Sequence, residues 1–291
     1  MLPEVSNSVY PRTTGRALSK NEAGSDSLRT GELAGDVDQS RSVCTRVCSE
    51  AIDLSIIIPA RNEERWLGAT LASAFAAVDL AAARQISAEI IVADNNSQDA
   101  TWALLQGFCK QDRIRAVWSG EAGAARARNC GRQQARGRIL VFVDADTHLP
   151  ADGLIRIKDW CDREGKEAGI TRLAGLEGGW RATIWWTFWE HVRRLPLAHA
   201  KAMPALMFCT AKVFDEFGPF DEEVAIGEEW PILASLYRQR RHCFVYDRSL
   251  TGLTSSRRMD RQVFGYSRTF FKYVWAILHK PGRINYTDRI R

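Results

Sequence analysis

Two aspartates, one residue apart, follow a run of five apolar residues in the stretch RILVFVDADTH, residues 138–148. Carboxylate oxygens are the ligands that Mg²⁺ and Mn²⁺ prefer, and one or two carboxylates commonly hold such a cation together with substrate phosphates. If the backbone stays extended through Asp146, Asp144 and Asp146 point to the same side, because side chains on a strand alternate with period two. The pair is therefore a candidate metal site for a phosphate-bearing substrate. Capping of the next helix or exposure to solvent is the alternative.

Polar clusters follow two further apolar runs. Residues 61–64 follow the run 54–58, and residues 94–99 follow the run 89–93. Open α/β sheets bind their ligands outside the carboxyl ends of the strands. We therefore expect these two clusters and residues 144–148 to line the same edge of one sheet.

The elements that would position these residues alternate along the chain. Apolar runs without polar alternation predict strands that are buried on both faces, and helical spacing of apolar residues predicts the helices between them. Pro59 is expected to stop the first strand, because proline has no N–H for the ladder. The order β-α-β-α-β-α-β predicts an α/β fold, a mainly parallel sheet flanked by helices in a single domain. The predicted strands are 54–58, 89–93, 115–118, 139–143, 169–176, 205–209 and 242–246; the predicted helices begin near 61, 101, 123, 152, 231 and 262, and 249–258 is a predicted polar loop.

Composition limits the classes of protein that fit. Residues 1–50 are polar and lack a hydrophobic period, so we expect a disordered leader. The net charge of +5 is mild and its basic residues are scattered, which disfavours a nucleic-acid partner. Seven irregularly spaced cysteines without a CxxC pair disfavour a disulfide framework or a zinc site and favour a reducing compartment. With no recognisable signal peptide or spanning segment, a cytoplasmic location is expected.

From residue 53 onward the sequence resembles the family 2 glycosyltransferases of the GT-A fold, which are nucleotide-sugar-dependent inverting enzymes. The segments that carry the resemblance are SIIIPARNEE, IIVADNNSQDAT, GAARARNCG, ILVFVDADT, FGPFDEE and GEEW, in the family's order and spacing over about four-fifths of the chain. The resemblance implies a Rossmann-like GT-A domain over residues 51–291. Its parts would be a nucleotide-sugar-binding half at 51–150, an acceptor half at 151–260 and a C-terminal helix at 261–291.

The resemblance also implies roles for residues in the first half. It places Ala60, Glu63 and Asp94 at the nucleobase and ribose, and Arg128 at the nucleotide. It implies that Asp144 lies near the ribose and the metal, whereas Asp146 is the direct ligand of Mg²⁺ or Mn²⁺. Without the resemblance, Asp94 would be interpreted as a turn-forming residue and Arg128 as a solvated helix residue. His148 is interpreted as a bystander.

In the second half, the resemblance implies a catalytic base in the pair Glu228-Glu229. Glu229 stands where aspartate is more common in the family, so its side chain is longer than the usual one by one methylene group. A helix N-terminus stabilises a carboxylate, so we expect Glu229 to be ionised. Arg257 and Arg258 are expected over the diphosphate, since the arginine fork suits phosphate oxygens. Acidic residues in an ordinary first helical turn and solvated loop charges are the alternatives.

The C-terminal helix carries a broad aromatic side flanked by basic residues, which include Arg268 and Lys272. Packing against its own domain is one interpretation, and peripheral contact with a membrane surface is the other. Trp185, Trp186, Phe188 and Trp189 are interpreted as core residues, with Trp180 or Trp230 as a platform for a sugar ring in the acceptor half.

The hypothesis from sequence is a metal-dependent inverting glycosyl transfer from a UDP- or GDP-sugar to a carbohydrate or lipid-linked acceptor. Two alternatives stay open. A non-catalytic nucleotide-sugar-binding protein would share the motifs. This alternative remains because Glu229 stands where aspartate is more common. A nucleotidyltransferase would need a glycine-rich basic loop after the first strand, where this chain has PARNEER.

Overall fold

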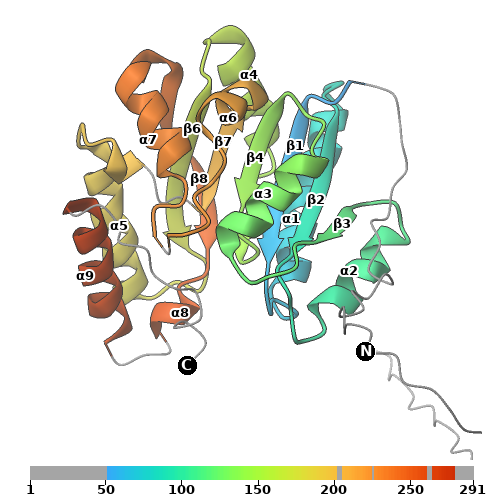
Figure 1. The fold of residues 1–291 in the computed structure, drawn as a ribbon, viewed down its shortest axis with the longest axis horizontal. Coiled ribbons are helices and arrows are strands. Elements are labelled where there is room, and N and C mark those ends of the chain that lie inside the picture. The colour runs from blue at the N-terminus through green and yellow to red at the C-terminus, as the bar shows by residue number, and fades with distance from the viewer. Residues whose placement is uncertain (1–50, 202–204, 225, 261–263, 279–291) are drawn as a thin grey trace, which may run out of the picture. The chain divides into compact units, whose positions relative to one another are not determined.

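The computed structural model describes residues 51–201, 205–224, 226–260 and 264–278 (Figure 1). All of them belong to one structural unit. The predicted leader, residues 1–50, and the end of the C-terminal helix, residues 279–291, lie outside the described residues. Within the described part of the chain, no helix combines the length and the apolar character that crossing a bilayer requires.

Eight described strands form one mixed sheet in the order β3-β2-β1-β4-β7-β6-β8-β5. Strands β3, β2, β1 and β4 are parallel, as predicted, and β8 is parallel to β6. Strand β7 is antiparallel to both of its neighbours, and β5 is antiparallel to β8. The predicted α/β class is therefore confirmed. The strands are β1 Leu54–Ala60, β2 Ala88–Asp94, β3 Arg115–Trp118, β4 Ile139–Val143, β5 Thr147–His148, β6 Ala168–Gly175, β7 Leu206–Thr210 and β8 Phe244–Thr254.

Helices cover both faces of this sheet. Helices α1, α2 and α4 pack on one face, and α3, α6 and α7 pack on the other. Helices α5 and α9 lie side by side beside β6 (Figure 1). The described helices are α1 Leu67–Ala82, α2 Thr101–Cys109, α3 Ala124–Gln134, α4 Gly153–Arg163, α5 Trp180–Arg194, α6 Ala211–Phe217, α7 Trp230–Gln239, α8 Arg257–Asp260 and α9 Gly265–Leu278, with 3₁₀ turns at His199–Lys201 and Arg241–Cys243.

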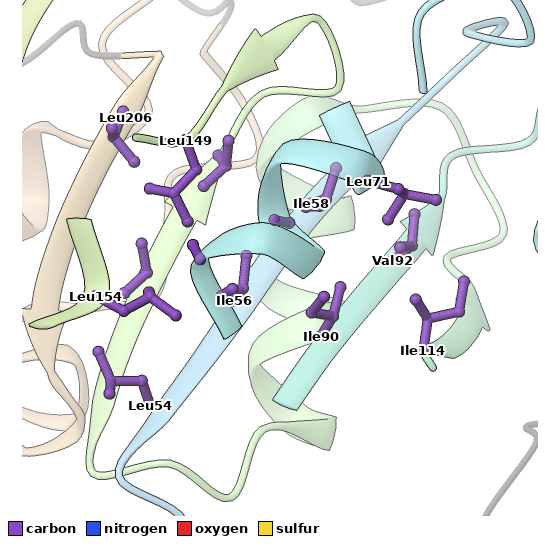
Figure 2. Close-up of a cluster of buried hydrophobic side chains, with 14 of the residues drawn as sticks. Leu54, Ile56, Ile58, Leu71, Ile90, Val92, Ile114, Leu149, Leu154 and Leu206 are labelled. Carbon is purple, nitrogen blue, oxygen red and sulfur yellow. The ribbon is translucent and has the colours of Figure 1, made fainter. Parts of the chain in front are cut away.

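Strand β1 shows why the apolar runs form central strands. Ile56 and Ile58 point toward α1 and pack with Leu71, as Figure 2 shows. Ile57 points to the opposite face, where an added Cβ on Gly131 of α3 would stand 2.5 Å from its Cγ2 atom. Full burial of each such side chain contributes about 1.5–3 kcal/mol. This two-sided packing fixes the carboxyl ends of β1, β2 and β4, where the polar clusters begin.

Four local predictions were wrong. The helix expected to begin near residue 61 begins at Leu67, and the N–H groups of Asn62 and Glu63 donate to Ser97 and Thr101. Strand β1 continues through Pro59 to Ala60. Its pairing with β4 ends at Ile57, so the N–H that proline lacks is not needed for a hydrogen bond to β4. Strand β8 extends to Thr254, where a polar loop was expected. It does so because β6 pairs with β8 along its length, with one register shift. The chain also turns after Asp144, whose carbonyl accepts a hydrogen bond from the Thr147 N–H at 2.9 Å, so the backbone is not extended through residue 146.

Candidate functional site

A pocket of about 720 Å³ lies at the carboxyl ends of β1, β2 and β4. All three polar clusters contribute to its wall. Residues 59–63 follow from β1, Asn95 follows β2, and residues 144–146 follow β4. Residues 227–229, just before α7, line the same pocket although they are about 80 positions away from the aspartates in the sequence. The pocket therefore brings the metal candidates and the base candidates together.

Arg128 of α3 connects these two groups of acids. Its guanidinium donates from Nη2 to Oδ1 of Asp144 at 2.7 Å and from Nη1 to Oε1 of Glu228 at 2.8 Å. Burial alone would lower the pKa of Arg128, but the charges of Asp144 and Glu228 raise it above its ordinary value. The guanidinium thus stays charged and holds both carboxylates beside the pocket.

The position of Arg128 is fixed by the residues that follow it on α3. The Asn129 side chain exchanges two hydrogen bonds with the backbone of Phe220, one donated to the carbonyl oxygen and one accepted from the N–H, both at 3.0 Å. Gly131 allows the helix to lie directly on Ile57 of β1. The segment ahead of α7 and the helix that carries Arg128 are therefore held to the same strands.

Arg257 does not itself line the pocket, but it forms a second bridge between two residues that do, Glu63 and Asp146. Its Nη2 atom donates to the carboxylate of Glu63 and lies 3.3 Å from Oδ2 of Asp146. The guanidinium also stands 4.9 Å from the ring centroid of Trp66. Arg257 begins the short helix α8, not a loop, and the side chain of Arg258 lies outside the described part of the structure.

Asp94 and Ala60 occupy different places. Ala60 lines the pocket, and its carbonyl oxygen accepts a hydrogen bond from the Asn95 N–H at 2.7 Å. Asp94 is buried, does not line the pocket, and accepts a hydrogen bond from the Ser97 N–H at 3.2 Å. The turn-forming role considered for Asp94 is thus present in the structure.

Glu229 lies at the start of α7 and is only 6% exposed. Burial, together with the charge of Glu228, raises its pKa to about 8, whereas the charge of Arg128 acts in the opposite direction. The expectation that the helix N-terminus keeps Glu229 ionised was wrong, because burial outweighs the helix. A carboxyl with this pKa is mostly protonated at pH 7 in the ligand-free protein.

Asp144 and Asp146 both line the pocket, and each carboxylate already contacts an arginine. Among the described residues, no group of three or more His, Cys, Asp or Glu side chains forms a metal site, and His148 does not line the pocket. Two carboxylates fit a Mg²⁺ or Mn²⁺ ion that takes its other ligands from water and phosphate oxygens. The donor set therefore suits a cation that arrives together with a phosphate-bearing ligand.

Helices α5 and α9 supply a wall of the pocket that sequence reasoning missed. Arg193 is 4% exposed and lines the pocket together with Lys272 and Tyr273. Burial, followed by the charge of Glu229, raises the pKa of Tyr273 to about 12. No spacing in the sequence links these helices to the acid pair, and their aromatic residues have the composition of an ordinary core.

The two proposed sugar platforms lie elsewhere. The ring of Trp230 is buried and stacks on His199, with 4.3 Å between the ring centroids. Trp180 is 74% exposed on α5, and neither tryptophan is among the residues that line the pocket. Trp185 and Trp189, predicted as core, are buried and do line it, whereas Phe188, also predicted as core, is 42% exposed.

Comparison with known proteins identifies the family of this fold and pocket. The model of glycosyl transferase family 2 matches residues 55–212. The dolichyl-phosphate beta-glucosyltransferase of Drosophila melanogaster is 36% identical over 107 residues, covering 34% of this chain and 32% of that protein. The succinoglycan biosynthesis protein ExoO of Rhizobium meliloti (strain 1021) is 26% identical over 209 residues, covering 66% and 58%. The chain thus spans about a third of the first relative and about three-fifths of the second.

Solved structures share the fold at low sequence identity. TarS 1–349 of S. aureus in complex with UDP-GlcNAc aligns with a TM-score of 0.55 and 18% identity, over 78% of this chain and 65% of that one. The mannosyltransferase PcManGT from Pyrobaculum calidifontis, in complex with GDP-Man and Mn²⁺, aligns with a TM-score of 0.56 and 17% identity, over 81% and 67%. Together with the family model, these similarities confirm the predicted resemblance: the chain belongs to glycosyl transferase family 2.

Proposed function

We propose that this protein is a metal-dependent inverting glycosyltransferase that moves a sugar from a UDP- or GDP-sugar to a hydroxyl of a carbohydrate or lipid-linked acceptor. The observation that carries the proposal is the Arg128 bridge, which joins Asp144 on the donor side to Glu228, the neighbour of Glu229, in one pocket. The fold shared with complexes that hold UDP-GlcNAc, or GDP-Man and Mn²⁺, supports this choice of donor and metal.

At the donor end, Ala60, Glu63 and Asp94 would bind the base and ribose. Arg128, Arg257 and Arg258 would contact the phosphate groups, and Asp146 with Asp144 would hold the Mg²⁺ or Mn²⁺ ion. When bound, this cation supplies Lewis-acid neutralisation of the charge on the departing diphosphate. The contact of Arg257 with Asp146 at 3.3 Å supports this role, because a metal held by Asp146 would bring the phosphate groups near the guanidinium.

At the acceptor end, Glu229 is the proposed base and Glu228 its supporting acid. Once ionised, Glu229 takes the proton of the acceptor hydroxyl, and the oxygen attacks the anomeric carbon from the side opposite the diphosphate. The new C–O bond forms as the bond to the diphosphate breaks, which inverts the anomeric centre. A pKa of about 8 suits this role, because general bases work best near the operating pH. A cytoplasmic protein at the inner face of a membrane is the proposed setting.

The test combines donor binding with turnover. We expect a UDP- or GDP-sugar with Mn²⁺ to raise the melting temperature and to be hydrolysed or transferred by the wild type. Glu229→Gln should keep the thermal shift and lose transfer. Glu164→Gln changes an exposed residue that does not line the pocket and should behave as wild type. No thermal shift and no turnover with any donor would refute the proposal.

A non-catalytic nucleotide-sugar-binding protein is the second candidate, since Glu229 is mostly protonated at pH 7. It predicts a thermal shift with no transfer at any pH. A nucleotidyltransferase is disfavoured, because the loop after β1 that lines the pocket is PARNE and lacks glycine.

A further inference from the structure

Helices α5 and α9 present an exposed apolar surface that the proposed reaction does not use. We call it the two-helix face. Its members are large side chains spaced four or seven residues apart along each helix, so those of one helix share one side of it. They are Trp180, Ile184 and Phe188 of α5, exposed by 74%, 61% and 42%, and Phe264, Phe271 and Trp275 at α9, exposed by 76%, 69% and 65%.

The two helices form one continuous surface. The ring centroids of Phe188 and Phe270 lie 5.5 Å apart, and those of Phe270 and Phe271 lie 5.6 Å apart. These contacts join the exposed ring on α5 to the exposed ring on α9, and Figure 1 shows the helices side by side. Monomeric soluble proteins rarely expose apolar patches of this kind, and a larger patch marks an interaction site.

The exposed charged side chains carried by α5 and α9 themselves are basic. Among the described side chains of α5 and α9, these residues are Arg181, Arg194 and Arg268, together with Lys272, which lines the pocket. The acid that these helices carry is Glu190, which is buried and pairs with Arg194 at 2.6 Å. The surface therefore combines aromatic rings with positive charge.

We propose that the two-helix face binds the surface of a lipid bilayer that contains anionic headgroups. Phenylalanine and tryptophan rings insert at the headgroup boundary, and arginine and lysine attract anionic lipids. A second copy of this chain is the less suitable occupant. A two-fold interface would place the same patch on both sides and bring like charges such as those of Arg181 and Arg268 together.

The opposite side of the same two helices lines the pocket. Arg193 of α5 and Thr269, Lys272 and Tyr273 of α9 face the cavity that holds Glu229. A bilayer bound to the outer side would therefore lie next to the acceptor half of the pocket. The consequence, that the acceptor hydroxyl belongs to a membrane-anchored molecule, rests on the proposed function. Binding to the bilayer does not depend on it.

The test is flotation of the full chain with vesicles of phosphatidylcholine and phosphatidylglycerol, compared with phosphatidylcholine alone. We expect binding to the mixed vesicles that weakens with added salt. The double substitution Phe271→Ser and Trp275→Ser should weaken the partition at least about tenfold, since both rings would leave the boundary. Leu80→Ser, which changes a residue of α1 that is 40% exposed, is the matched control and should bind as wild type.

Three results would overturn the proposal: no flotation of the wild type, equal flotation of the double variant, or sedimentation showing a wild-type dimer that the double substitution abolishes. The thermal shift with UDP- and GDP-sugars is measured on the same samples. A variant that keeps this shift is folded, so loss of flotation then reports on the face. A wild type that floats without any shift would support the bilayer proposal while contradicting the donor proposal.

Discussion

The ionisation of Glu229 leads to a prediction about the pH dependence of transfer. Burial and the charge of Glu228 raise its pKa to about 8, and only the ionised form can accept the proton of the acceptor. If Glu229 is the base, kcat/KM should rise with pH and level off above 8. An ordinary exposed glutamate, with a pKa near 4.3, would give no change in kcat/KM between pH 6 and 9.

The size of the effect follows from the pKa. A single carboxyl with a pKa of about 8 would be about half ionised at pH 8, about one-tenth at pH 7 and about one-hundredth at pH 6. The logarithm of kcat/KM should therefore fall with a slope of one below the inflection. The inflection in kcat/KM belongs to the free enzyme, which is the state that the structure describes.

Glu228→Gln tests the cause of the shift. This substitution removes the carboxylate whose charge raises the pKa of Glu229, and it frees the Nη1 donor of Arg128, whose charge lowers it. Both changes lower the pKa of Glu229, so the inflection of kcat/KM should move to lower pH. The inflection can be measured from the rate of nucleoside diphosphate release between pH 5.5 and 9.5, in steps of about half a pH unit. Glu164→Gln serves as the exposed control.

Two results would refute this reasoning. A profile that is flat between pH 6 and 9 in the wild type would show that no group with a pKa near 8 limits the reaction. An inflection that stays in place in Glu228→Gln would show that the titrating group is not the neighbour of Glu228. In either case Glu229 would lose its proposed role, whereas donor binding would be unaffected.

Four further outcomes are expected. Glu229→Gln should raise the free energy of unfolding, because a carboxyl whose pKa rises from 4.5 to about 8 on folding destabilises the protein as pH increases through that window; chemical denaturation should show a gain that grows with pH across it. Arg257→Gln should raise the KM for the nucleotide sugar about tenfold, unlike the exposed Arg163→Gln, as initial rates at varied donor will show. Asp146→Asn should raise the Mn²⁺ concentration for half-maximal activity by about tenfold in a metal titration. Gly131→Ala should destabilise the fold by about 1–3 kcal/mol in urea, since its Cβ would stand 2.5 Å from Ile57, and a melting temperature equal to wild type would contradict that packing.

The parallel half of the fold could be predicted because its strands are apolar on both faces. Strands β3 and β4 and helix α2 begin and end where their sequence patterns change, as residues 139–143 illustrate. Strand β8 could not be predicted to its full length. Its second half alternates between exposed and buried residues and contains Ser249 and Thr251, which have the composition of a loop. Pairing with β6, a contact that is distant in the sequence, decides its conformation.

The motif residues of the candidate site could likewise be identified from sequence, but their environment could not. Asp144, Arg128 and Glu228 stand in recognisable segments, whereas Arg193 and Tyr273 come from helices without any motif. The same helices form part of the pocket in which Glu229 is buried. The expected charge of Glu229 was wrong for that reason: a helix N-terminus is a local property, and burial is a tertiary one.

The shared arginine gives a physical reason why the donor and acceptor ends of this pocket are not independent. Arg128 divides its guanidinium between Asp144 and Glu228, and the charges of Asp144, Glu228 and Arg128 all act on the pKa of Glu229. Asp144 raises that pKa, so any ligand that neutralises Asp144 lowers it and leaves more of the arginine's charge for the acid pair. Occupation of the donor end therefore favours ionisation of the proposed base. We therefore expect a cation bound at Asp144 to ease proton abstraction by Glu229, the proposed base.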